Sequence, residues 1–178
     1  MLDNQLIQLF RPLIQNGLIS NGYPNVTVKQ NYQPTQQGVN TGPTVYFNKI
    51  SDRRYGFLKR EDVYNTNTNQ MVHTESQWYE TTFQISALVI QDPKNISYTA
   101  SDLVNIVAMI MQSDATRIAL LNGGAGIYRI TDVRNPYFLD DQDRWEASPS
   151  FDFTLTHEQV SSIIDPSTNS VVPGIYRV

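Results

Sequence analysis

The clearest pattern in the chain is an alternation of apolar and polar residues between Trp78 and Ile90. One side of this segment carries Tyr79, Phe83, Ile85, Ala87 and Val89. The other side carries Glu80, Thr82, Gln84 and Ser86. A period of two predicts a strand of an antiparallel sheet that has one covered and one solvated face. A second such strand is predicted over Trp145–Thr156, where Trp145, Ala147, Phe151, Phe153 and Leu155 share one face.

Three segments have the periodicity of helices. From Leu2 to Ile14 the apolar residues recur at helical spacing, and Gly17 is a natural stop. The best helix begins at Thr99, three residues before Asp102, as in a capping box. Its apolar face consists of Leu103, Ile106, Val107, Ile110 and Met111. A short further helix, capped by Ser113 or Asp114, is expected to run to Leu121 and to end at Asn122-Gly123-Gly124.

The remaining segments predict strands and loops. Shorter strands are expected at Val26–Lys29, Thr44–Ser51 and Ile127–Val133, and the polar run from Gln30 to Gly42 is expected to be an exposed loop. Two weakly apolar strands, Tyr55–Tyr64 and Met71–Trp78, flank the turn-rich tract Asn65–Gln70 and predict a long β-hairpin. Because apolar residues are sparse in it, we expect residues 56–78 to extend beyond the core sheet.

The order of these elements predicts an α+β domain. We expect an antiparallel sheet with two main helices packed on one face and a long projecting β-hairpin. Leu103, Ile106, Val107 and Ile110 should pack on the face that carries Phe83, Ile85, Phe151 and Phe153, since a one-sided sheet needs a cover. Residues 1–160 are expected to form this single domain, and residues 161–178 a C-terminal extension.

Composition narrows the classes of function. The 178 residues carry 13 Lys and Arg against 17 Asp and Glu, a net charge of −4, and no cysteine. The absence of cysteine excludes disulfides, thiol nucleophiles and Cys-ligated metals. The acidic balance argues against binding along a phosphate backbone. Neither a membrane-spanning apolar run nor a secretory signal is evident. Asn, Gln, Thr and Ser supply 57 residues and replace charges as the main polar groups.

No motif predicts an active site, a metal or a cofactor. The glycines of Gly123–Gly126 follow a helix and precede a strand, the reverse of a phosphate loop. Asp140, Asp141 and Asp143 are clustered, but Glu146 stands where a Ca²⁺ loop needs glycine. The chain has two histidines, His73 and His157, but no Gly-x-Ser-x-Gly motif that would expose a nucleophilic serine.

Two groups of residues are candidates for contacts between proteins. Charged residues gather near the base of the predicted hairpin and asparagines at its turn, so we expect subunit-interface roles for Arg53, Arg54, Lys59, Arg60, Glu61, Asp62, Asn65, Asn67 and Asn69. Asp140, Asp141 and Asp143 are expected to form a patch of negative potential at a rim or lumen, without a metal.

Several stretches resemble the tail terminator, or neck terminator, proteins of long-tailed bacteriophages. They are LDNQLIQLFRPLIQNGL, YGFLKREDVYN followed by ESQWYETTFQISALV, and SDLVNIVAMIMQSDATRIALL leading to GIYRITDVRNPYFLDDQDRWEASPSFDFTLT. The resemblance covers about residues 1–157 and rests on the order of elements, because the family has no catalytic signature.

The resemblance implies a non-enzymatic virion protein of the neck, assembled in the host cytoplasm as a ring, commonly a hexamer. The ring would close the tail tube, join it to head-completion or connector proteins, and let DNA pass without specific binding. The sheath protein is a further candidate partner. Three alternatives remain open: another head-tail connector or tail-completion protein, a metal-dependent hydrolase that uses the Asp140–Asp143 cluster, and a monomeric module that binds carbohydrate or peptide through Trp78 and Tyr79.

Overall fold

A computed structural model describes residues 1–31, 42–89, 98–139 and 145–165. These residues form three helices, α1 (Asp3–Ser20), α2 (Ala100–Gln112) and α3 (Asp114–Asn122). The strands are β1 (Thr27–Gln30), β2 (Thr44–Asn65), β3 (Gln70–Leu88), β4 (Ala125–Ile130), β5 (Tyr137–Leu139), β6 (Trp145–Ala147) and β7 (Ser150–Asp165). Five of them form one sheet in the order β1-β2-β3-β7-β4, and β5 pairs with β6 separately.

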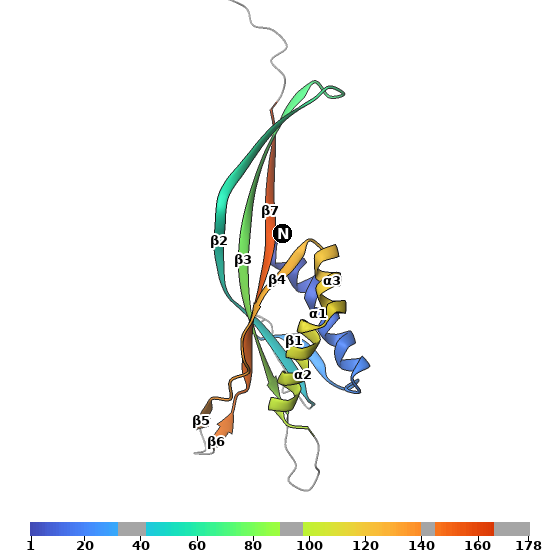
Figure 1. Ribbon diagram of the computed structural model, residues 1–178, viewed down its shortest axis with the longest axis vertical. Helices are drawn as coiled ribbons and strands as arrows, with labels where there is room; N and C mark the ends of the chain where they lie inside the picture. Colours follow the sequence, from blue (N-terminus) through green and yellow to red (C-terminus); the bar gives the residue numbers. More distant parts are fainter. Residues whose placement is uncertain (32–41, 90–97, 140–144, 166–178) are drawn as a thin grey trace, which may run out of the picture.

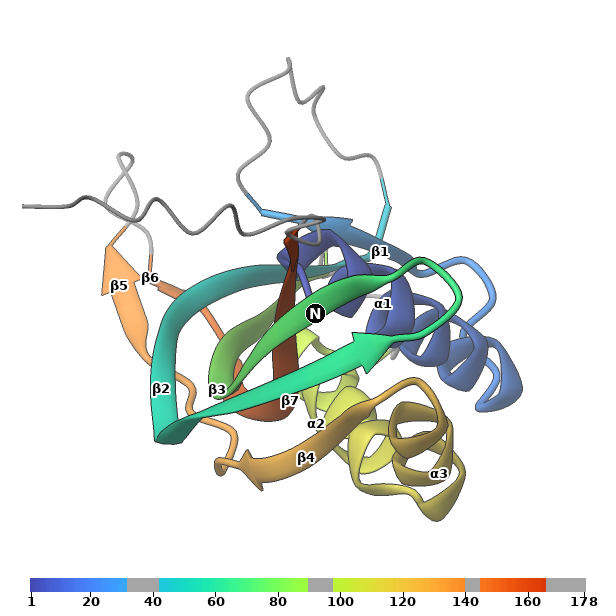
Figure 2. The same ribbon diagram turned by 90° about the horizontal axis from the view of Figure 1, so that it is seen from above.

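The α+β prediction is confirmed. All helices lie on one side of the sheet, and β2, β3 and β7 rise far above them along the long axis of the molecule (Figures 1 and 2). The sheet is antiparallel except at one edge, where β1 pairs parallel to β2 over Thr44–Phe47. The projecting hairpin is therefore present, and β2 and β3 form its two strands.

Aromatic rings fill the centre of the core. Phe10 of α1 contacts Phe47, Phe83 and Phe153, with ring centroids 5.2, 4.9 and 5.2 Å away. All four rings are fully or almost fully buried. The alternation predicted from Trp78 to Ile90 is confirmed up to Leu88, where β3 ends, because Phe83, Ile85 and Ala87 face the helices while the intervening residues are half-exposed. Ile90 lies outside the described residues. The core thus lies between the helices and the lower half of the sheet.

The capping box of α2 is confirmed. The backbone N–H of Asp102 donates to Oγ1 of Thr99 at 3.2 Å, and that of Thr99 donates to Oδ2 of Asp102 at 2.9 Å. Leu103, Val107 and Ile110 are buried as expected, but Ile106 is only half-buried. Val104 is fully buried in its place. The apolar face of α2 is therefore rotated slightly from the predicted one.

The predicted end of the first helix at Gly17 is wrong. α1 continues to Ser20, and a Cβ atom on Gly17 would lie 2.5 Å from Cγ2 of Ile110. Glycine is required there because α1 and α2 approach closely, and the chain turns only at Gly22, whose φ is +89°. Leu2 lies before the helix and is exposed instead of joining the apolar stripe.

The predicted strand Trp145–Thr156 is also wrong in its bounds. It is broken at Ser148 and Pro149, so Trp145 and Ala147 belong to β6 in the small sheet and not to the face of Phe151. Proline lacks the N–H that a strand would need there. β7 begins at Ser150 and continues beyond Thr156 to Asp165. The acidic cluster Asp140–Asp143 lies outside the described residues.

Candidate assembly surface

The upper halves of three strands form a sheet without a cover, which we call the blade. It consists of β2 from Ser51, β3 up to Glu80 and β7 from His157 (Figure 1). Every residue of β2 from residue 50 to 65 is exposed. The described helices contact the blade only at its base, through Met1 and Asp3. Above that level both of its faces and both of its long edges are available for contacts.

The face of the blade turned away from the helices carries exposed apolar residues among polar ones. Val63, Val72 and Ile164 stand in register across the three strands, so their side chains share this face. Further towards the core, Tyr55 and Trp78 are also paired in register. Ile164 is 60% exposed and Trp78 44%. Exposed apolar groups that line up in this way are typical of a surface that another protein covers.

On the opposite face of the blade, which is the helix side, charged side chains of neighbouring strands form pairs. Nε of Arg60 lies 3.0 Å from Oε1 of Glu75, which joins β2 to β3. Nδ1 of His73 lies 2.7 Å from Oδ1 of Asp62. The hydrogen bond with Asp62 is the main reason that the pKa of His73 is raised. These pairs are exposed to solvent, so they align the strands more than they stabilise the fold.

The β7 edge of the blade presents unpaired backbone groups. β4 covers β7 only as far as His157, and the carbonyl of Glu158 accepts a hydrogen bond from the amino group of Met1. Successive residues of a strand direct their backbone groups to opposite sides. Val160, Ser162 and Ile164 therefore turn their N–H and C=O groups to the same side as Glu158, where none of the described segments pairs with them.

The β2 edge of the blade is open as well. β1 pairs with β2 only up to Phe47, and none of the described strands continues along that side. The edge is bent by two irregularities in its pairing with β3, at Lys49/Ser51 and at Tyr55/Lys59. The second contains Gly56, with φ of +73°, and Phe57, which is 99% exposed. The blade thus has two open edges that differ in sequence.

All of the predicted interface residues that precede the turn lie on β2 within the blade and are exposed: Arg53, Arg54, Lys59, Arg60, Glu61, Asp62 and Asn65. Lys59 bonds to Glu61 at 3.0 Å. Arg53 and Arg54 have no ion-pair partner among the described residues. Asn67 and Asn69 lie in the turn, where the N–H of Asn67 donates to Oδ1 of Asn65 at 3.0 Å and Asn69 adopts a φ of 55°. The asparagines therefore shape the turn, and their role at an interface stays a prediction.

Sequence reasoning missed the β7 edge. Residues 158–165 read EQVSSIID, and their exposed apolar members are Val160, Ile163 and Ile164. The segment has no Lys, Arg or Pro, which are residues that commonly protect an edge strand. The apolar residues past Thr156 do not alternate with polar ones, so the pattern gave no signal that the strand continues.

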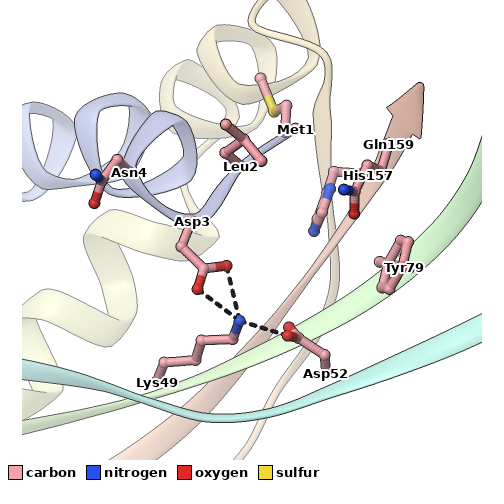
Figure 3. A pocket seen from close by; sticks show the side chains of 9 residues that line it. All are labelled: Met1, Leu2, Asp3, Asn4, Lys49, Asp52, Tyr79, His157 and Gln159. Carbon is pink, nitrogen blue, oxygen red and sulfur yellow. Dashed lines mark hydrogen bonds and ion pairs between the residues drawn. The ribbon is translucent and has the colours of Figure 1, made fainter. Parts of the chain in front are cut away.

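A polar pocket of about 470 Å³ lies where the blade meets the N-terminal helix (Figure 3). Nζ of Lys49 binds Oδ1 of Asp3 at 2.7 Å and Oδ2 of Asp52 at 2.5 Å. Partial burial opposes the charge of Lys49, but the two carboxylates outweigh it and raise its pKa. The network ties α1 to β2 at the base of the blade.

His157 continues this network into the sheet but does not form a hydrolase triad. Oγ1 of Thr81 donates to Oδ1 of Asp52 at 2.7 Å and lies 2.9 Å from Nε2 of His157. The hydroxyl thus lies between the carboxylate and the imidazole, whereas in a triad the imidazole lies between the other two groups. Thr81 is also fully buried. Burial lowers the pKa of His157, so the imidazole is neutral and is a buried structural group.

Within the described ranges, His, Asp and Glu residues form no group of three or more that could hold a metal ion. No single described helix has the length and apolar composition to cross a membrane; α2 and α3 reach that composition only as a pair bent by 57°.

Comparisons with known proteins agree with this picture. The profile of the family described as E217 gateway protein gp29 matches residues 5–166. No curated protein sequence matches the chain. Among solved structures, the sheath/tube terminator of an extracellular contractile injection system (PVC), in its extended state, has a similar fold, with a TM-score of 0.52 and 11% identity over 100% of this chain. This chain spans 64% of the length of that terminator chain.

The family match covers most of the chain, including α1, the blade and the core. The structural match adds a terminator of a contractile machine to the proteins that share the fold. The resemblance to phage neck proteins is thereby confirmed, and the chain belongs to the phage gateway protein family.

Proposed function

We propose that this chain is a structural protein of the phage neck. Its copies would form a closed ring, a hexamer, in which one edge of each blade contacts the other edge of the next blade. The observation that carries the proposal is the blade, which has two open and different edges and exposed apolar residues on the face turned away from the helices. A ring needs such an interface, in which two different patches on each subunit complement one another. Membership of the gateway family supports the location in the neck.

The strand directions fit a ring. β2 and β7 both run antiparallel to β3, so they are parallel to each other. Rotation about an axis along the strands preserves this direction, and β2 of one copy would then lie parallel to β7 of the next. In that arrangement the helices of all copies stay on one side of a shared sheet. Backbone hydrogen bonds would supply the affinity, as in β-strand addition generally.

The charges favour pairing of unlike edges. The β2 edge carries Arg53 and Arg54 without ion-pair partners among the described residues, whereas the β7 edge carries Glu158 and Asp165 and no basic residue. Two β7 edges would bring acidic groups together. A β2 edge at the same level would instead bring Arg54, which is level with His157, close to Glu158. The mixed pairing therefore gives each interface opposite charges.

The partners of the ring follow from the family. Copies of the chain would contact one another, the tail tube protein and the head-completion or connector protein, with the sheath protein as a further candidate. DNA would pass through the lumen without specific binding, in keeping with the net charge of −4. Asp140, Asp141 and Asp143 are proposed to face the rim or lumen.

Cysteine pairs test the ring directly, because the natural chain contains no cysteine. Glu61 and Ser162 both pair with Thr74, so they lie at one level on the face turned away from the helices. Glu61→Cys is combined in turn with Val160→Cys, Ser162→Cys and Ile164→Cys, which covers shifts of register. Within one copy the two positions are two strands apart, about 10 Å, which is too far for a disulfide.

Oxidation of at least one double variant should give a ladder of covalent multimers that ends at the ring number, with six as the expected last band. The matched controls, each with one cysteine, should give no ladder. Dimers from a single-cysteine variant would show that like edges meet. Monomers from every double variant at high protein concentration would overturn the proposal.

A further inference from the structure

His73 lies between two carboxylates near the outer end of the blade. Its Nδ1 is 2.7 Å from Oδ1 of Asp62 on β2, and its Nε2 is 3.2 Å from Oδ2 of Asp165 on β7. An ionised carboxylate only accepts hydrogen bonds, and a neutral imidazole has a single N–H to donate. Both contacts are hydrogen bonds only when the imidazole carries both of its protons. The geometry therefore describes an imidazolium that connects all three strands of the blade.

We propose that His73 is a positioning residue for assembly, which ties the end of β7 to β3 and β2 and so holds the open β7 edge in place for the next copy. This inference rests on the proposed function, because it concerns the same edge. The residues that would pair with the next copy, Val160, Ser162 and Ile164, lie within the segment that ends at Asp165.

The β7 end has little else to hold it. Ile163 and Ile164 are 63% and 60% exposed, so apolar burial contributes little at this level. One edge of the segment is open, and the backbone ladder to β3 is its main remaining support. Segments with few buried contacts open locally at low cost. A cation that binds both neighbouring strands is therefore well placed to decide how ordered this edge is.

The charged groups that face His73 set the direction of a pH effect. On the helix side of the blade these are Asp62 from β2, Asp165 from β7 and the Arg60–Glu75 ion pair beside them. The carboxylates raise the pKa of His73, with the bond to Asp62 as the largest cause. The contribution of His73 to order is complete below its ordinary pKa of about 6.5 and is lost as the pH rises through the higher pKa of the folded protein.

Hydrogen exchange on the isolated chain tests the contact separately from assembly. The backbone groups of Ile163 and Asp165 point towards β3, so their amides report on the ladder. Protection factors, corrected for the intrinsic pH dependence of exchange, are compared at pH 5.5 and pH 8.5. We expect protection of both amides to be about two- to five-fold higher at the lower pH, the range of an exposed ion pair. His73→Gln should remove this difference, and His73→Arg, with a permanent cation, should keep protection high at both values. Equal protection in the natural chain at both pH values would overturn the inference.

Assembly is the second measurement. Disulfide ladder formation in the double-cysteine variants, initiated with an oxidant active at both pH values, should be more extensive at pH 5.5 than at pH 8.5, and His73→Arg should make it independent of pH. A ladder with the same pH profile in the His73→Arg background would overturn the role of His73 while leaving the ring intact. Absence of any ladder, with the shift in protection present, would overturn the ring and with it the assembly role of His73.

Discussion

Replacement of Gly17 by alanine tests how closely α1 and α2 are packed. Gly17 lies in the last turn of α1, three residues before its final residue Ser20, where alanine would ordinarily be the better residue. A Cβ atom there would lie 2.5 Å from Cγ2 of Ile110 and 3.0 Å from its Cγ1 and Cδ1. Ile110 is only 5% exposed, so its branched side chain has little room to move away.

Two effects of opposite sign decide the outcome. Alanine favours a helix interior over glycine by about 1 kcal/mol. Overpacking of a well-packed core costs about 1–3 kcal/mol. Three atoms of Ile110 are too close, so we expect the clash to win and Gly17→Ala to lower the free energy of unfolding by about 1–2 kcal/mol.

Urea denaturation, followed by circular dichroism, measures this change. The decisive comparison is the same substitution in an Ile110→Ala background, which lacks all three contacting atoms. There Gly17→Ala should raise the free energy of unfolding by up to about 1 kcal/mol, because only the helix preference remains. Asn16→Ala, at an exposed position of α1, controls for propensity. Stabilisation by Gly17→Ala in the natural chain, or an equal effect in both backgrounds, would refute the packing argument.

Four further outcomes are expected. Val104→Ala should cost about 2–4 kcal/mol in urea denaturation because Val104 is fully buried, and Ile106→Ala should cost clearly less because Ile106 is half-exposed; equal losses would contradict the observed rotation of α2. Replacing Asn65–Gln70 with Asn-Gly should leave the melting temperature nearly unchanged but weaken multimer formation on a sizing column, and unfolding of the monomer would place the hairpin in the core. The pKa of His157 is lowered in the folded state, so the unfolded chain binds more protons and stability should fall as the pH drops below about 6.5; His157→Gln should flatten thermal melts taken between pH 7.5 and pH 5, and an unchanged slope would contradict this. Changing the acidic residues of Asp140–Asp143 to asparagine should alter stability by less than about 1 kcal/mol, and a melting temperature that rises with Ca²⁺ only in the natural chain would instead indicate a metal site.

Local chemistry was sufficient for much of the fold. The alternation between Trp78 and Ile90 identifies a half-buried strand, because successive side chains of a strand point to opposite faces. Thr99 and Asp102 mark the start of α2 because their side chains and backbone bond to each other within four residues. The tract Asn65–Gln70 marks the hairpin turn for the same local reason. Each of these features depends on neighbours in the sequence.

Other features depend on residues far apart in the chain, and only the tertiary structure decided them. Gly17 has the same sequence context whether it ends a helix or lets Ile110 approach, and the packing of α1 on α2 selects the second. His157 meets Thr81 and Asp52 only because β7 and β2 flank β3. The open edge of β7 depends on where β4 stops pairing. The sequence by itself therefore determined which residues are apolar and where elements begin, whereas the fold determined which surfaces stay uncovered, because exposure depends on every other segment of the chain.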